Sequence, residues 1–191
     1  FTIPMGTFEH PPTMAWYNLN QIHITFDQNV DIRQNDLRLF GTNIPEYALS
    51  RLNYDPQTFT ATWTLDSPLG NDQLRLVLSD DVNRNGVSLD GETENPQSVN
   101  LPSGNGVAGG DFELHFNVLK NDLDLNHIVD FEDYLLMTTA IFPLFEKPKY
   151  NLFFDLNGDG KISMLDYSEG TQSLMFFNLF TVFVTAYYVS W

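Results

Sequence analysis

Oxygen-bearing side chains recur at regular spacing in one short stretch near the carboxyl end of the chain. Residues 155–166 carry them at the first, third, fifth, ninth and twelfth positions, as Asp155, Asn157, Asp159, Ser163 and Asp166. A hard cation such as Ca²⁺ takes six to eight oxygen ligands, and a twelve-residue loop supplies them from these side chains and from the backbone carbonyl of position 7, here Lys161. Gly160 at position 6 permits the sharp turn that such a loop needs. The spacing therefore predicts a calcium site.

The same spacing recurs in residues 122–133. Its oxygen-bearing side chains are Asp122, Asp124, Asn126, Asp130 and Asp133, and the carbonyl at position 7 belongs to Ile128. The residue at position 6 is His127 instead of glycine, and a left-handed backbone costs a non-glycine residue about 1–2 kcal/mol. Seven of the ten acidic residues after position 118 occupy ligand positions in the two loops, which a solvated surface does not explain. The sequence predicts two calcium sites, of which the first is weaker or slightly reshaped.

A helix is expected to follow each loop. Residues 131–141 and 165 to about 175 have helical patterns, and Pro143 and Pro148 interrupt the chain between them. Position 12 of both loops is Asp, although the EF-hand pattern has Glu there. Because Asp is one methylene shorter, each helix must begin closer to its ion.

Two Asp-ended calcium loops, each followed by one helix, resemble a type I dockerin over residues 119 to about 176. The resemblance implies a small non-catalytic module that binds a cohesin domain and assembles extracellular complexes, often polysaccharide-degrading ones. The family selects its partner with loop positions 10 and 11, which are here Phe131, Glu132, Met164 and Leu165. Cellulosomal dockerins usually carry small hydroxyl residues there, so we expect a more apolar partner contact.

The first 118 residues have the alternation of apolar and polar side chains that is typical of strands. Strands are predicted at 1–3, 22–26, 37–40, 49–54, 58–65, 74–78 and 112–118. The Asp-Pro-Gln turn at 55–57 predicts a hairpin between the fourth and fifth of these. About seven short strands, each with one apolar face, predict a β-sandwich.

The segments 22–31, 54–69 and 74–78 resemble bacterial Ig-like domains of surface-layer and large secreted proteins. That resemblance implies a spacer, an adhesive unit or a presenter of a neighbouring module. The expected organisation is an Ig-like β-sandwich at 1–118, a dockerin-like module at 119–176 and an apolar carboxyl-terminal extension at 177–191.

Charge and composition narrow the classes of partner. The chain has a net charge of −16, from 9 basic and 25 acidic residues, which argues against nucleic acid and anionic membrane surfaces. Without cysteine it has no disulfide, zinc–thiolate site or thiol nucleophile. Calcium loops of modest affinity are most useful where calcium is plentiful, which predicts an extracellular or bacterial cell-surface location.

Other candidate sites are weaker. Residues 81–92 also fit the calcium-loop expression, but Ser88 at position 8 cannot anchor a loop, so a turn-rich connection is favoured over a third calcium site. His23 and His115 would form a metal pair only if their strands were neighbours. No hydrolase or phosphate-binding signature is visible, and the clustered carboxylates are assigned to calcium, so a non-enzymatic protein is expected.

Residues 170–191 carry no charge and are long enough to span a bilayer as a helix. Polar residues dilute this run and no Lys or Arg follows it, so a packed extension is favoured over a membrane anchor.

These features together predict a non-catalytic extracellular module that binds two Ca²⁺ ions and attaches its parent protein to a cohesin-like partner or a surface assembly. Its partner is a cohesin-like domain or the β-sandwich of the same chain. One alternative is a purely structural or adhesive segment that calcium makes rigid. Another is an accessory part of a polysaccharide-degrading enzyme whose catalytic domain lies outside these 191 residues.

Overall fold

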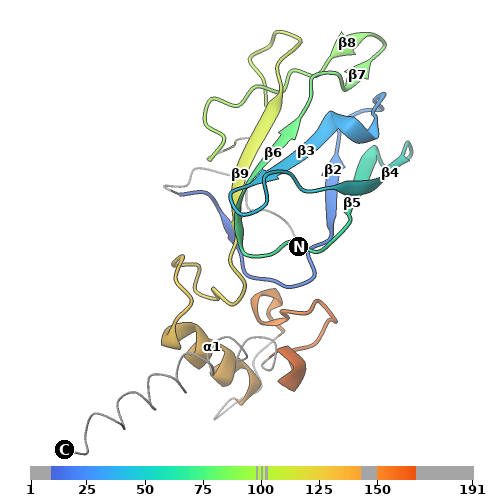
Figure 1. Cartoon of the computed structure of the whole chain (residues 1–191). Helices are drawn as coiled ribbons and strands as arrows, with labels where there is room; N and C mark the ends of the chain where they lie inside the picture. The colour runs from blue at the N-terminus through green and yellow to red at the C-terminus, as the bar shows by residue number, and fades with distance from the viewer. Residues whose placement is uncertain (1–9, 98, 100, 102, 143–149, 167–191) are drawn as a thin grey trace, which may run out of the picture. The chain divides into compact units, whose positions relative to one another are not determined.

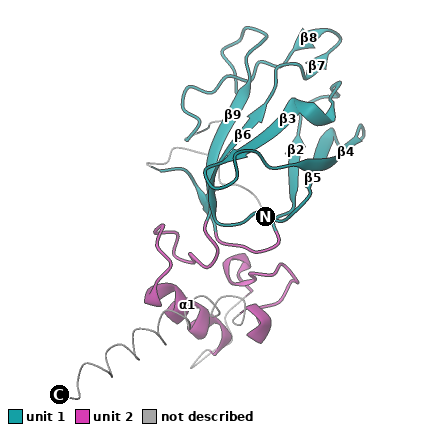
Figure 2. Cartoon of the chain, viewed as in Figure 1, with its two compact units in different colours: residues 1–14, 19–118 teal, residues 15–18, 119–191 magenta. Residues whose placement is uncertain are grey.

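The structure is a computed structural model that describes residues 10–97, 99, 101, 103–142 and 150–166. Its contacts divide the chain into two compact units, shown in Figure 2. The first, here called the β unit, comprises Phe1–Met14 and Leu19–Val118, and the second, the loop unit, comprises Ala15–Asn18 and Leu119–Trp191. Four residues from the amino-terminal region thus belong to the loop unit, although the sequence predicted that residues 1–118 form one domain.

The β unit consists of two larger sheets and one small hairpin (Figure 1). The four-stranded sheet has the order β1 (Thr13–Met14), β9 (Phe112–Val118), β6 (Asp72–Leu78), β3 (Leu37–Gly41). The three-stranded sheet has the order β2 (Gln21–Thr25), β5 (Thr60–Leu65), β4 (Leu49–Asp55). The hairpin pairs β7 (Asn83–Arg84) with β8 (Val87–Ser88). Strand β1 runs parallel to β9, and the other pairings are antiparallel.

Six of the predicted strands correspond to β2, β3, β4, β5, β6 and β9, with bounds that agree to within two residues, whereas the short strands β1, β7 and β8 were not predicted. The hairpin predicted across residues 55–57 is confirmed as the antiparallel pair β4–β5. Strand β5 begins later than predicted because the Asp55 carboxylate accepts hydrogen bonds from the Gln57 amide and the Thr58 hydroxyl, which extends the turn. The predicted strand at 1–3 lies outside the described residues.

Alternate side chains of the strands form the core of the β unit. Leu74, Leu76 and Leu78 of β6 are at most 3% exposed. Trp63 of β5 is fully buried, and its indole N–H donates a hydrogen bond to the Gln34 carbonyl at 3.1 Å, in the short 3-10 helix Gln34–Asp36. The period-two burial of β5, β6 and β9 is what a sheet with one apolar face requires, and it is consistent with a β-sandwich.

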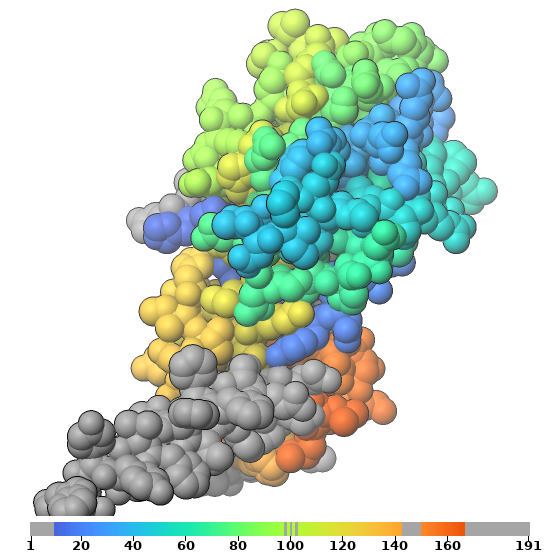
Figure 3. All heavy atoms as spheres, in the orientation of Figure 1, coloured from blue at the N-terminus to red at the C-terminus, as the bar shows by residue number. Residues whose placement is uncertain are grey.

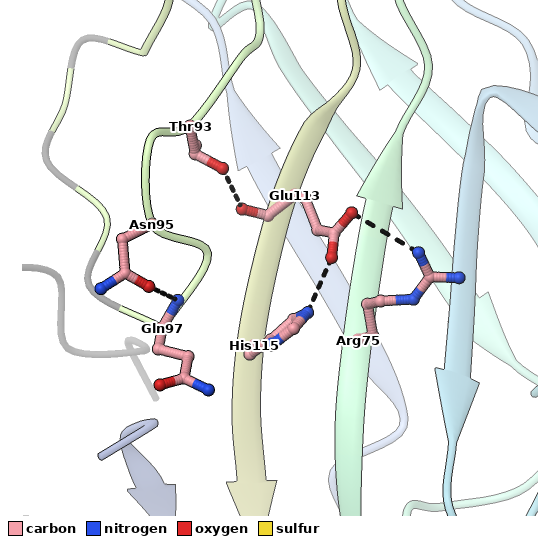
Figure 4. A network of polar contacts seen from close by, with 6 residues as sticks. All are labelled: Arg75, Thr93, Asn95, Gln97, Glu113 and His115. Atoms are coloured by element: carbon pink, nitrogen blue, oxygen red, sulfur yellow. Dashed lines mark hydrogen bonds and ion pairs between the residues drawn. The ribbon is translucent and has the colours of Figure 1, made fainter. Parts of the chain in front are cut away.

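Polar side chains cover part of the outer face of β6 and β9 (Figure 4). Glu113 lies 2.7 Å from His115 Nε2 and 3.5 Å from an Arg75 nitrogen, and its backbone carbonyl accepts a hydrogen bond from Thr93. His23 lies on β2 of the other sheet and hydrogen-bonds Thr62. The strands of His23 and His115 are therefore not neighbours, and the condition for a metal pair is not met.

The segment 81–92 forms the β7–β8 hairpin, with Asn85 and Gly86 at φ 52° and 81° in its turn. Asn-Gly is the preferred pair for such a two-residue turn. The Asp90 carboxylate accepts hydrogen bonds from the amides of Asn105 and Gly106, both at 2.8 Å. This connection, green to yellow in Figure 3, gathers with its neighbouring loops at one end of the β unit. Its geometry favours the turn-rich reading over a third calcium loop.

The loop unit contains one described α-helix, α1 (Phe131–Ile141), which confirms the first predicted helix. A 3-10 helix, η2, spans Leu152–Phe154, and the backbone is helical again at 164–166. The rest of the second predicted helix and the apolar run 170–191 lie outside the described residues. Within the described residues, no helix combines the length and the apolar character needed to cross a bilayer.

Candidate calcium-binding site

Three carboxylates converge in the first loop. Asp122, Asp124 and Asp133 each present an oxygen within 4.8 Å of the others, at loop positions 1, 3 and 12. Asp130 caps helix α1, because the Asp130 carboxylate accepts a hydrogen bond from the Glu132 amide. The Asp133 carboxylate accepts a hydrogen bond from the Asp130 amide at 2.8 Å. This reciprocal cap places Asp133, in the first turn of the helix, near the start of the loop. Among the described residues, this is the closest-gathered set of acidic groups suited to a metal ion.

The position 1 carboxylate is held in the same way in both loops. One oxygen of Asp122 accepts the His127 amide at 3.0 Å, and one oxygen of Asp155 accepts the Gly160 amide at 2.8 Å. In both loops, therefore, the backbone amide of position 6 donates a hydrogen bond to the carboxylate of position 1.

The position 12 carboxylate is also held alike. In the first loop Asp133 accepts the amides of Asp124 at 3.3 Å and Asp130 at 2.8 Å. In the second loop Asp166 accepts the amides of Asn157 at 3.2 Å and Ser163 at 2.9 Å. The last residue of each loop therefore binds the backbone of positions 3 and 9 and closes the turn.

Two turn positions in each loop adopt a left-handed backbone. Position 6 has φ 70° in His127 and 84° in Gly160, as the motif requires. Position 4 has φ 60° in Leu125 and 75° in Gly158. The left-handed backbone at Leu125 was not predicted, although Gly158 at the same position of the second loop was a signal for it.

The carboxylates at positions 1 and 12 are removed from solvent. Asp122, Asp133, Asp155 and Asp166 are at most 1% exposed. Burying carboxylates without a compensating positive charge is costly, and one Asp122 oxygen is buried with no hydrogen-bond partner among the described residues. This orphaned oxygen and the oxygen-only donor set fit a calcium ion.

The pKa of Asp122 is raised by its burial and by the neighbouring carboxylates. Burial raises it to about 6, against the lowering effect of the His127 amide, and the charges of Asp133 and Asp124 raise it further. A carboxyl group with such a pKa is partly protonated in mildly acidic solution, so cation binding must displace its proton.

The remaining predicted ligands line the loops with side chains already engaged in local turns. Asn126 accepts the Ile128 amide at 2.8 Å, and Asp159 accepts the Lys161 amide at 2.9 Å. Ser163 accepts the Leu165 amide at 3.1 Å. Coordination by these side chains, and by the carbonyls of Ile128 and Lys161, stays a prediction.

The predicted partner-binding residues lie at the surface. Phe131, Met164 and Leu165 are 63%, 54% and 61% exposed, and Glu132 is exposed as well. The Phe131 ring tilts against Tyr134, with centroids 5.8 Å apart.

One residue that supports the second loop carried no spacing signal in the sequence. The Tyr150 hydroxyl donates a 2.6 Å hydrogen bond to Asp155, and this bond is the main reason that the pKa of Tyr150 rises to about 12. Tyr150 therefore contacts the position 1 carboxylate from outside the twelve-residue loop.

Part of the loop unit matches a known protein family. Residues 120–174 match the family model of the dockerin type I domain. Dockerin type I domains bind calcium and cohesin domains, are not catalytic, and typically occur in secreted cellulosome components. No curated protein matches the chain. The match covers less than a third of the chain, so it describes this region alone.

Proposed function

We propose that residues 119–176 form a calcium-binding interaction module with two sites, which attaches its parent protein to a cohesin-like partner. The observation that carries this proposal is the burial of the position 1 and position 12 aspartates in both loops, each at most 1% exposed. The two loops differ in sequence but share the hydrogen bonds from position 6 to position 1 and from positions 3 and 9 to position 12. The dockerin type I match to residues 120–174 supports the same function.

The proposed ligands fall into two sets of six residues. The first set is Asp122, Asp124, Asn126, Ile128, Asp130 and Asp133, and the second is Asp155, Asn157, Asp159, Lys161, Ser163 and Asp166. A bound calcium ion supplies positive charge among carboxylates that otherwise repel one another. Asp133, which also hydrogen-bonds the capping residue of α1, would couple ion binding to the start of that helix.

The proposed partner surface consists of positions 10 and 11 of both loops. Phe131, Met164 and Leu165 expose apolar side chains there, and Leu135, one turn after Phe131, is 51% exposed. An exposed apolar group of this kind fits a partner that buries hydrophobic surface, with Glu132 at its polar edge. The β unit, as an Ig-like spacer on a secreted or surface-attached parent, would present this module.

The test of calcium binding is a calorimetric titration of the whole chain with circular dichroism alongside. Wild type should show two binding events, Asp122→Ala should lose one, and Asp155→Ala should lose the other. A single event abolished only by Asp155→Ala would mean that the His127 loop is inactive. No binding at millimolar calcium would refute the proposed function.

The test of partner binding is capture by a panel of immobilised cohesin domains, with and without a calcium chelator. Phe131→Ala and Met164→Ala should reduce calcium-dependent capture and leave calcium binding intact. Phe142→Ala is a matched control because Phe142 is an aromatic residue that is 55% exposed at the C-cap of α1 and is not one of the four proposed partner positions. A chain that binds calcium but no cohesin would favour the structural or adhesive alternative.

A further inference from the structure

The segment Ala15–Asn18, here called the strap, follows β1 in the chain but belongs to the loop unit (Figure 2). Ala15 is fully buried and Trp16 is 4% exposed. A short connection between strands normally runs over the surface. The first two residues of the strap are instead buried, whereas Asn18 at its end is exposed.

The strap binds the start of the second loop. The Trp16 indole N–H donates to the Leu152 carbonyl at 3.0 Å, and the Trp16 ring stacks on Phe153 with centroids 5.5 Å apart. The Tyr17 amide donates to the Leu156 carbonyl at 3.0 Å. Leu156 is fully buried at position 2, next to the Asp155 ligand position.

The strap also binds the start of the first loop. The Asn121 amide donates to the Ala15 carbonyl at 3.1 Å, and the Tyr17 hydroxyl donates to the Asn121 side-chain oxygen at 2.9 Å. Asn121 directly precedes Asp122, is 3% exposed and has φ 75°. These bonds hold Asn121 in a conformation that few residues other than glycine adopt.

We propose that the strap is a third component of the calcium-binding unit and that Trp16 and Tyr17 are positioning residues for the two loops. This inference rests on the proposed calcium function. The strap hydrogen-bonds residues beside position 1 of each loop, so its loss leaves the first ligands free to adopt other conformations. If only a fraction of the molecules holds the loop in its binding conformation, the apparent dissociation constant for calcium rises by the inverse of that fraction. The family match begins at residue 120 and does not include the strap.

The test compares Trp16→Phe with Trp63→Phe in the whole chain. Each substitution keeps an aromatic ring and removes one indole hydrogen bond to a backbone carbonyl, to Leu152 at 3.0 Å or to Gln34 at 3.1 Å. Trp16→Phe should weaken calcium binding about three- to tenfold, the effect of one buried hydrogen bond. Trp63→Phe changes only the β unit and should leave calcium affinity unchanged.

Single-loop backgrounds assign each contact to its loop. In Asp122→Ala, where only the second loop binds, Trp16→Phe should retain its effect. In Asp155→Ala, where only the first loop binds, Tyr17→Phe should weaken binding about threefold by loss of the hydroxyl that holds Asn121. Circular dichroism shows whether each variant folds, and Tyr17→Phe is the milder change should Trp16→Phe unfold the unit.

The outcomes separate this inference from the function on which it rests. If wild type binds calcium and the strap variants bind it equally well, the strap has no positioning role and the calcium function stands. If Trp16→Phe and Trp63→Phe weaken binding alike, the effect is general destabilisation and the inference is overturned. If wild type binds no calcium, the proposed function fails and the strap inference fails with it.

Discussion

Buried aspartates in this chain have different roles, which depend on how many hydrogen-bond donors surround each carboxylate. Asp72 in the β unit is 6% exposed and accepts the amides of Thr42 and Asn43 and the hydroxyl of Tyr47. Asp122 in the loop unit is fully buried, and one of its oxygens has no hydrogen-bond partner in the part of the chain that the structure describes. The satisfied carboxylate stabilises a turn, whereas the unsatisfied one is suited to a cation.

The pKa of Asp122 predicts how calcium affinity depends on pH. Because burial raises this pKa to about 6, calcium-free protein gains stability from protonation as the pH falls, and loses that contribution as the pH rises through about 6. Calcium must displace the proton, so the first loop should bind about tenfold more weakly at pH 5 than at pH 7. Titration of Asp155→Ala at both pH values measures this, with Asp122→Ala as the control, and a flat profile for the first loop would contradict it.

The left-handed residue at position 6 predicts an asymmetry between the loops. His127→Gly should relieve about 1–2 kcal/mol of backbone strain, partly offset by about 0.5–1 kcal/mol of glycine entropy, and so tighten calcium binding to the first loop up to about tenfold. The reverse change, Gly160→His, should weaken calcium binding by the second loop through its φ of 84°, since no atom of the described residues lies within 4 Å of an added Cβ. Calorimetry on both variants tests this, and equal affinities before and after the exchange would argue against strain.

At the scale of elements, a helix and a strand connection depend on single aspartates. Helix α1 begins where predicted because Asp130 and Asp133 form a reciprocal cap at its amino end. The connection from β3 to β4 is held by Asp72, which lies on the neighbouring strand β6. In both cases a carboxylate accepts hydrogen bonds from backbone amides that begin a helix or a turn.

Replacement of Asp72 by Asn should destabilise the β unit by about 2–3 kcal/mol, because the amides of Thr42 and Asn43 and the buried Tyr47 hydroxyl lose a charged acceptor. Burial opposes ionisation of Asp72, but the hydrogen bonds outweigh it and hold its pKa below the usual value. The contribution is therefore present at neutral pH and is lost as the pH falls through that lowered pKa. Hydrogen exchange of β3 and β6 amides measures the effect, and the exposed Asp66→Asn should show none.

At the scale of the whole molecule, the two units should respond differently to calcium. Calcium at a hundredfold excess over the dissociation constant stabilises each occupied site by about 2.7 kcal/mol, which a chelator removes. Hydrogen exchange should therefore rise in α1 and the two loops on chelation, with little change in β5, β6 and β9. Equal changes in both units would show that calcium acts outside the loops.

The sequence by itself determined the elements whose causes are local. The period of two in residues 74–78 and 112–118 specified strands, and the aspartate spacing of 122–133 and 155–166 specified both loops and the helix Phe131–Ile141. Only three-dimensional contacts decided which aspartates are buried, since that depends on packing between distant segments. The same applies to Tyr150 beside Asp155 and to the Trp16–Leu152 bond, which joins residues 136 positions apart. No local spacing records such a pair, because its energy comes from burial and hydrogen bonds formed only in the folded unit.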